Sequence, residues 1–243
     1  MPSSSPRLPP LIAIVGCDGS GKSTVSGELL TWINKVYGPA AAAHLGKQQG
    51  NTGRSLANLP LIGNWLEGFI GRKASTVKKF RTENKAPHTF PALVMYAFTL
   101  RRVRRFRRMM ALRQKGLIIV ADRFPQLDFP SAFDGPDLSV GAQGNQFVQW
   151  LAQREQKSFE WMTSYRPDLV LRLNVDIDTA FARKPDHRRD ALQRKIEITP
   201  QLTFDGAHIV EIDAAAPLAA VVAAAEEAAA HTLTELGYPR SGA

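Results

Sequence analysis

The chain has 243 residues, of which 44% are hydrophobic and 22% charged, an ordinary composition for a globular protein. No apolar run approaches the roughly 18 residues of a membrane span, and the N-terminus lacks an apolar signal-peptide core, so we expect a cytoplasmic protein with no transmembrane segment. Cys17 is the single cysteine, which excludes an intrachain disulfide. Residues 1–10 predict a disordered leader, and residues 11–243 a single domain.

The first predicted unit is a strand, a glycine-rich loop and a helix. An apolar run over 11–15 precedes Gly16-Cys17-Asp18-Gly19-Ser20-Gly21-Lys22-Ser23, and a helical stretch begins at Thr24. The loop fits G-x-x-x-x-G-K-S/T, the phosphate-binding loop, whose backbone N–H groups and following helix attract phosphate. Lys22 would reach the β- and γ-phosphates of a nucleotide, and the Ser23 hydroxyl would hold Mg²⁺. The sequence therefore predicts that ATP and Mg²⁺ bind here.

The rest of the chain alternates strands and helices. In chain order we expect a strand over 40–45, a loop with a short helix over 46–90, a helix over 90–114 ended by Gly116, a strand over 117–121, a loop over 124–145, a helix over 146–165, a strand over 169–173, a basic helical stretch over 178–195, a strand over 208–212 and a helix over 217–236. Repeated βα units predict an α/β fold of the P-loop type, a three-layer sandwich with helices on both faces of a parallel sheet. In the helix over 146–165, large apolar residues are spaced for burial: Phe147, Trp150, Leu151, Trp161 and Met162.

Most of the net charge of +9 lies in residues 101–115, which hold seven Arg, one Lys and no acid. Helical spacing places an apolar stripe through Tyr96, Val103, Phe106 and Met110. Four of the eight cations lie on the opposite face: Arg101, Arg105, Arg108 and Lys115. A solvated face is one interpretation, and attraction to an acidic surface partner is the other. Arg102 lies at the border of the stripe and could turn inward towards a phosphate. A nucleic-acid binder more often spreads its charge over a face, so the pattern argues against nucleic acid.

A second chemical signal is Asp122-Arg123, at the carboxyl end of the strand over 117–121. That end of a parallel sheet faces the ligand crevice, where Asp122 could hold Mg²⁺ or orient an attacking hydroxyl. An arginine in the next position stabilises charge on a transferring phosphoryl group and does not serve as a base. Arg123 therefore favours transfer to a bound acceptor over hydrolysis.

The basic stretch that follows the strand over 169–173 predicts a lid around 178–195. Arg183, Arg188 and Arg189 lie in it, and a lid of this kind brings cations to the γ-phosphate and expels water. A solvated basic helix, partly neutralised by Asp186 and Asp190, is the alternative.

The chain resembles the thymidylate kinase-like family of nucleoside monophosphate kinases. The resemblance rests on four segments: the loop over 16–24, which looks like G-x-D-G-x-G-K-S/T-T; Asp122-Arg123-Phe124, which looks like D-R-Y; the spacing from Arg102 through Gly116 to Asp122; and Arg166-Pro167-Asp168-Leu169, which looks like the P-D-L strand with a basic lid after it. The R-E-P-G motif of that family is replaced by His44-Leu45-Gly46-Lys47-Gln48-Gln49, and the segment after D-R-Y by residues 124–130.

The resemblance implies an ATP- and Mg²⁺-dependent kinase that contacts donor and acceptor through the matched residues. Asp18 would contact the acceptor near its sugar hydroxyl, and Arg102 would hold the acceptor phosphate. Arg123 would bridge the donor and acceptor phosphates, with Asp122 near Mg²⁺. Arg183, Arg188 or Arg189 would act from the lid. The nucleotide-binding set would be Gly16, Asp18, Gly19, Ser20, Gly21, Lys22, Ser23 and Thr24.

Three functions remain open from the sequence. The first is a nucleoside monophosphate kinase with a nucleotide acceptor, and the second is a P-loop kinase of a sugar or of a glycan or lipid-linked precursor. The third is a nucleotide-binding module or nucleic-acid-linked ATPase that uses residues 101–115 as its contact. A homodimer is also left open, because the family that the chain resembles often dimerises.

Overall fold

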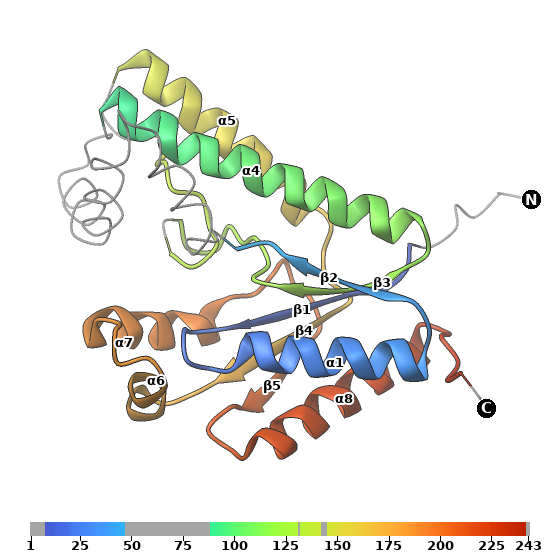
Figure 1. Ribbon diagram of the computed structural model, residues 1–243. Helices are drawn as coiled ribbons and strands as arrows, with labels where there is room; N and C mark the ends of the chain where they lie inside the picture. The colour runs from blue at the N-terminus through green and yellow to red at the C-terminus, as the bar shows by residue number, and fades with distance from the viewer. Residues whose placement is uncertain (1–7, 47–87, 131, 142–144, 242–243) are drawn as a thin grey trace, which may run out of the picture.

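The computed structural model of the chain describes residues 8–46, 88–130, 132–141 and 145–241 (Figure 1). Its elements are β1 (Leu11–Gly16), α1 (Lys22–Val36), β2 (Ala40–His44), α4 (Thr89–Gln114), β3 (Ile118–Asp122), α5 (Gln146–Thr163), β4 (Leu169–Asn174), α6 (Ile177–Arg183), α7 (Arg189–Ile198), a 3₁₀ turn (Thr199–Gln201), β5 (Ile209–Asp213) and α8 (Leu218–Glu235). The expected leader up to residue 7 and the expected short helix within 46–90 lie outside the described residues.

The five strands form one parallel sheet in the order β2-β3-β1-β4-β5. β1 lies in the centre with all six residues buried, as a strand covered on both faces should. Its register sets Ile14 opposite Asp122 of β3, and β3 sets Asp122 opposite His44 of β2. The carboxyl ends of β1, β2 and β3 therefore bring the phosphate loop, His44 and Asp122 to one edge of the sheet.

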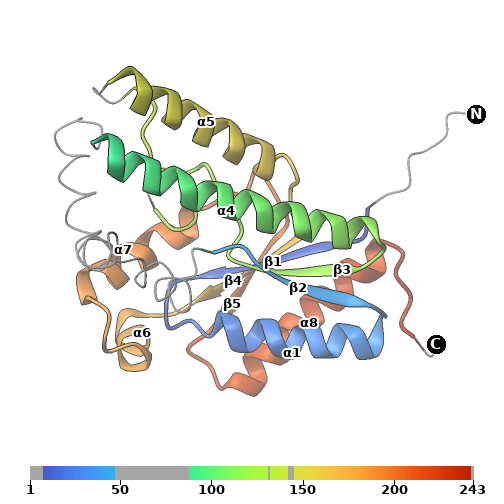
Figure 2. The same cartoon turned by 45° about the horizontal axis from the view of Figure 1, so that its top comes forward.

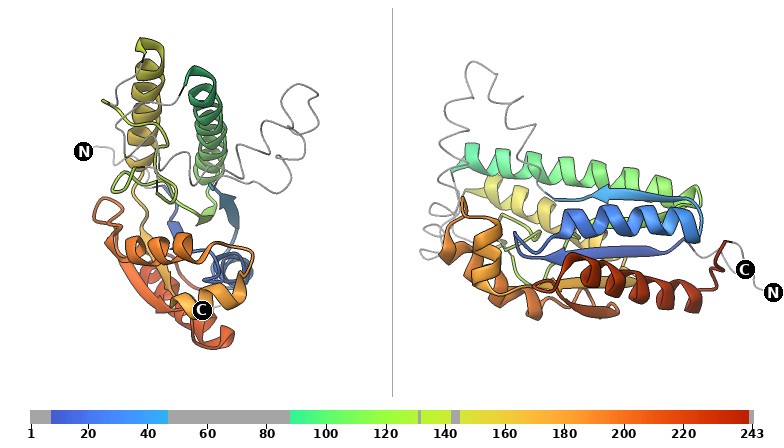
Figure 3. Two further views of the ribbon diagram at one scale, coloured as in Figure 1. Left: turned by 90° about the vertical axis from the view of Figure 1, so that its left-hand side faces the viewer. Right: turned by 60° about the horizontal axis from the view of Figure 1, so that its bottom comes forward.

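Alternate residues of each strand face two separate cores, which gives the three layers. On one face Ile12 and Ile14 pack with α1 and α8. On the other face Leu11, Ala13 and Val15 pack with Phe106 of α4 and with α5. Figures 2 and 3 show α4 and α5 side by side over one face of the sheet, and α1 beside α8 over the other. The expected α/β three-layer architecture is confirmed.

Two details of the helices differ from expectation. Phe147 and Trp150 are 44% and 45% exposed and stack on each other, because the buried stripe of α5 runs through Val148, Leu151 and Phe159, one helical step away. The prediction that Phe147 and Trp150 are buried was wrong. The basic stretch over 178–195 is two helices, α6 and α7, and the segment between them contains Pro185, which cannot continue a helix.

The apolar stripe of α4 is confirmed, and several of its arginines contact other parts of the chain. Arg102 and Arg113 are buried in ion pairs with Asp134 and Asp168. Arg105 donates to the Gly46 carbonyl at 2.6 Å, and Arg107 lies over the ring of Trp161. Much of the charge of residues 101–115 thus serves internal contacts. None of the helices in the described part of the chain combines the length and apolarity needed to cross a membrane.

Candidate functional site

The loop between β1 and α1 has the backbone that a phosphate loop requires. Gly19 has φ +89°, and a Cβ there would lie 2.7 Å from the Ala180 carbonyl oxygen, so only glycine fits between the loop and α6. Lys22 is the first residue of α1 and is buried, with Nζ 2.5 Å from the Cys17 carbonyl oxygen and 3.5 Å from Ser20 Oγ. Ser23 and Thr24 follow on the exposed first turn. The Lys22 ammonium therefore lies against the loop, where it would also contact a phosphate bound by the loop.

The environment of Lys22 is unfavourable for charge. Burial lowers the pKa of Lys22, and the nearby Arg123 lowers it further, while Asp18 and Asp122 act in the opposite direction. Bringing the anionic phosphates of a nucleotide next to this ammonium would offset both unfavourable effects. A buried cation poised in this way is typical of an anion-binding site.

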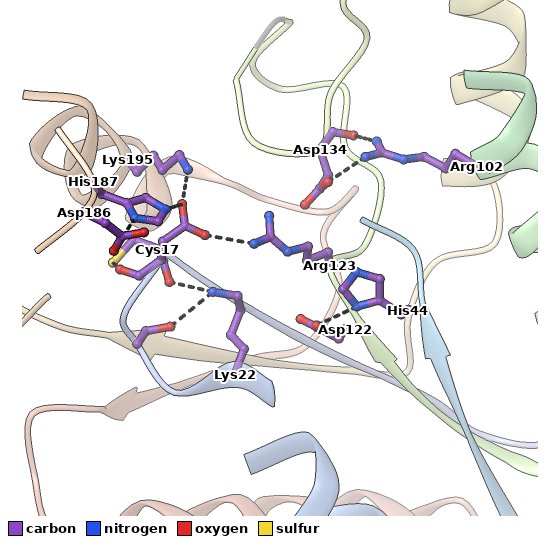
Figure 4. Close-up of polar contacts among 12 residues, drawn as sticks. Cys17, Lys22, His44, Arg102, Asp122, Arg123, Asp134, Asp186, His187 and Lys195 are labelled. Carbon is purple, nitrogen blue, oxygen red and sulfur yellow. Dashed lines mark hydrogen bonds and ion pairs between the residues drawn. The ribbon is translucent and has the colours of Figure 1, made fainter. Parts of the chain in front are cut away.

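Asp122 ends β3 and is buried beside His44, which ends β2. Asp122 Oδ2 lies 2.9 Å from His44 Nδ1, and its Oδ1 has no hydrogen-bond partner in the described part of the chain (Figure 4). A buried carboxylate oxygen without a donor is costly unless a cation or a ligand hydroxyl completes its shell. Mg²⁺ prefers oxygen ligands and keeps waters and substrate phosphates in its remaining positions. Asp122 therefore fits the part predicted for it in a Mg²⁺ site.

Arg123 and Asp18 join the carboxyl ends of β3 and β1. Arg123 has φ +65°, rare for a residue with a side chain, and its Nη2 donates to Asp18 Oδ1 at 2.8 Å. Lys195 of α7 pairs with the other oxygen of Asp18, and His187 Nε2 lies 4.0 Å from it. Burial alone would raise the pKa of Asp18, but Lys195 and Arg123 hold the pKa well below its usual range.

Gly46 is close behind Arg123. A Cβ on Gly46 would lie 2.2 Å from Arg123 Cδ and 3.2 Å from His44 Nε2. The backbone at Gly46 therefore serves as a wall against which the arginine side chain lies. Any larger residue at position 46, two residues after the end of β2, would overlap the Arg123 side chain in this arrangement.

The three lid arginines have different positions. Arg183 donates to the carbonyls of Gly19 at 3.3 Å and Ala214 at 2.8 Å, so it touches the phosphate loop. Arg188 and Arg189 are exposed and pair with Asp190 and Asp178. The structure thus brings Arg183 to the loop and leaves the other two at the surface.

Arg102 turns inward, as its border position allowed, but its partner is a carboxylate. Its guanidinium donates to the backbone oxygen of Asp134 at 2.5 Å and to Asp134 Oδ1 at 2.6 Å, and both side chains are buried. Next to this pair is a small cavity that reaches back to Lys22 and Arg123. The other residues lining the cavity are Val15, Gly16, Phe124, Gln126, Phe133, Asp134, Leu202 and Phe204.

Sequence reasoning missed His44, Gly46, Asp134 and Lys195. His44 carries a usable signal, because it ends a predicted strand just as Asp122 does. Lys195 was included in the expected lid but not singled out, since a lysine at the end of a basic helix is ordinarily a solvated residue. Nothing in the local sequence links Asp134 to Arg102, which lies 32 positions earlier.

Comparison with known proteins places the chain in a family. No protein-family model matches it. Over 208 residues it is 43% identical to the uncharacterized ATP-binding protein YghS of Escherichia coli K12, a match that covers 85% of this chain and 86% of that protein. Over 222 residues it is 39% identical to the uncharacterized ATP-binding protein YghR of the same strain, covering 91% and 87% of the two chains. The chain belongs to the family of YghS and YghR.

Proposed function

We propose that this protein is an ATP- and Mg²⁺-dependent phosphotransferase of the P-loop kinase type. The names of YghS and YghR support ATP as the nucleotide. Lys22 would bind the β- and γ-phosphates, and Ser23 with Asp122 would hold Mg²⁺, which when bound neutralises phosphate charge. Arg183 contacts the loop from α6 and would reach the same phosphates from the lid over 178–195.

The observation that carries the proposal is the position of Arg123. Its guanidinium lies between the phosphate loop, through Asp18, and the end of β3, where Asp122 is buried. A cation there is suited to stabilise charge on a phosphoryl group in transfer, whereas an ATPase needs a group that activates water. Transfer would proceed in line: an acceptor oxygen forms a bond to the γ-phosphorus as the bond to the β–γ bridging oxygen breaks, and ADP leaves. Positioning and charge stabilisation supply the catalysis, with no covalent enzyme intermediate.

The resemblance to thymidylate kinase-like enzymes implies a nucleoside monophosphate as acceptor, and this finer assignment stays a prediction. The catalytic set that we propose is Lys22, Asp122, Arg123 and Arg183. Arg188 and Arg189 would join it only through a movement of α7, since both face solvent in acidic pairs.

The test is ADP release from ATP and Mg²⁺ with and without acceptors, with Lys22→Ala as the matched blank. Removing the ammonium should lower turnover by at least 100-fold, because a charge contact to the transferring group is lost. Folding should be retained, since Lys22 lies outside both sheet cores, and circular dichroism would check this. Unchanged turnover in the variant would refute the assignment.

A further inference from the structure

The acceptor side of the candidate site presents a carboxylate where a phosphate-binding cation was expected. Asp134 lines the cavity next to Lys22 and Arg123, and Arg102 does not. The Arg102 side chain is 2% exposed, and both of its terminal nitrogens donate hydrogen bonds to Asp134. In Figure 4 Asp134 lies between Arg102 and Arg123. An incoming group would therefore meet the Asp134 carboxylate before the Arg102 guanidinium.

Asp134 is held in this position by a loop built around one glutamine. Gln126 Nε2 donates to the carbonyls of Phe129 at 2.9 Å and Ala132 at 2.8 Å, and its Oε1 accepts from the Phe129 N–H at 2.8 Å. Phe133, just before Asp134, has φ +50°, a conformation that is costly for a phenylalanine. Backbone strain of this kind persists only where the surroundings fix it, and it gathers at ligand sites.

Most of the remaining wall of the cavity is apolar, with Gln126 as the polar exception. Phe124, Phe133 and Phe204 line it together with Leu202. Among the described residues, Lys22 and Arg123 are the cations that line it, and both are assigned above to the transferring phosphoryl group. A second phosphate in the cavity would lie against a buried carboxylate. Aromatic faces with one carboxylate suit an uncharged compound whose hydroxyl groups donate hydrogen bonds to the acid.

We infer that the phosphoryl acceptor presents an uncharged hydroxyl group, as a sugar or a nucleoside does, and not a phosphate monoester. The inference rests on the phosphotransferase activity proposed above. Asp134 Oδ1 accepts from Arg102, and the carboxylate also interacts with the charge of Arg123. No hydrogen bond to its other oxygen is found in the described part of the chain, and a ligand hydroxyl would donate to that oxygen. Arg102 acts as the positioning residue that holds Asp134 in place.

The chemistry of the two acceptor classes differs by one proton. A hydroxyl oxygen bonds to the γ-phosphorus, the bond to the β–γ bridging oxygen breaks, and the hydroxyl proton passes to solvent water. Each transfer then yields a phosphate monoester, ADP and one proton. A phosphate dianion as acceptor has no proton to lose, so that reaction releases none above about pH 8, where a phosphate with its second pKa near 6 is fully ionised.

The acceptor class can be tested without knowing the acceptor. A deproteinised small-molecule extract of E. coli is divided, and one half is treated with alkaline phosphatase, which is then removed by ultrafiltration. Both halves receive γ-³²P-labelled ATP, Mg²⁺ and enzyme, with Lys22→Ala as the blank, and label is followed into products other than inorganic phosphate. Matched pairs of defined compounds, thymidine against thymidine monophosphate and glucose against glucose 6-phosphate, are run beside them with a proton count at pH 8.

We expect transfer of label to persist in the phosphatase-treated half. Transfer that is lost with the treatment would overturn the inference and leave the phosphotransferase standing. No transfer in either half would refute the phosphotransferase itself, and the inference with it. Among the matched pairs, turnover of a phosphorylated member in preference to its neutral partner, without proton release, would also overturn the inference.

The role of Asp134 can be tested with a variant once an acceptor has been found in the extract or among the matched compounds. Asp134→Asn keeps the shape of the side chain and removes its charge, and Glu160→Gln makes the same change on the exposed face of α5 as a control. We expect the KM for a hydroxyl acceptor to rise at least tenfold in Asp134→Asn, while the KM for ATP stays within twofold. An unchanged acceptor KM would overturn the role of Asp134, and binding of a fluorescent ATP analogue checks that the variant is folded.

Discussion

Replacing Gly46 by alanine should displace Arg123 without unfolding the protein. The new Cβ would lie 2.2 Å from Arg123 Cδ, whereas carbon atoms in contact need about 3.5 Å. The backbone of Gly46 cannot easily retreat, because its carbonyl accepts from Arg105 at 2.6 Å. The arginine side chain must therefore move by about 1 Å, and the ion pair with Asp18 must lengthen or break. Gly46 is not among the residues with positive φ, so alanine can adopt its backbone conformation.

The size of the effect follows from the role proposed for Arg123. A misplacement of about 1 Å at a catalytic group can cost about 100-fold in rate, or about 2.7 kcal/mol of transition-state stabilisation. We expect kcat to fall by about that factor in Gly46→Ala, with the KM for ATP changed little because the phosphate loop is untouched. The assay is acceptor-dependent ADP release at saturating ATP, together with a thermal unfolding curve.

The control is a glycine-to-alanine substitution at a position where the new Cβ meets no other atom. A Cβ on Gly27, in the middle of α1, has no atom within 4 Å. Gly27→Ala should raise stability by about 0.5–1 kcal/mol through helix propensity and leave kcat unchanged. Wild-type turnover in Gly46→Ala, beside a neutral Gly27→Ala, would refute the placement of Arg123 at the transferring phosphoryl group.

Two further predictions concern the residues that surround the phosphate loop. Arg123→Ala should lower kcat by about 100- to 1000-fold and change the dissociation constant of ATP only slightly, and an effect confined to ATP affinity would exclude Arg123 from the transition state. Because Lys195 and Arg123 lower the pKa of folded Asp18 despite its burial, the carboxylate stabilises the fold above its unfolded pKa of about 4, and this contribution is lost as the pH falls further. Urea unfolding between about pH 5 and pH 2 should therefore show a steeper loss of stability in the wild type than in Asp18→Asn, and parallel curves would contradict the coupling.

The sequence predicted those parts of the molecule that depend on local pattern. Apolar runs located the buried strands, and the loop motif placed the start of the following helix at Thr24, two residues after its observed start at Lys22. Asp122 could be assigned to the ligand edge because all parallel strands end on the same side. The exposed positions of Phe147 and Trp150 could not be foreseen, because helical spacing alone admits more than one apolar stripe on α5.

Contacts between distant segments account for most of what the sequence left out. Lys195 reaches Asp18 only because α7 turns back over the carboxyl end of the sheet after the break that contains Pro185. Asp134 meets Arg102 because Gln126 folds its loop against α4, and no spacing rule covers that arrangement. The acceptor class proposed above rests on the contact of Asp134 with Arg102, so it is the part of the candidate site that the sequence describes least.

The packing of α1 against α8 has a consequence for the synthesis of the protein. The phosphate loop leaves the ribosome before α8 does, yet the helix behind the loop packs against α8, where Leu29 and Ile33 share one core with Ala225 and Leu233. The nascent chain therefore holds the loop without its full support until α8 has been made. A chain terminated before Leu218 would leave this face of α1 bare to water, so a premature stop should yield a substrate for proteolysis instead of a partly active enzyme.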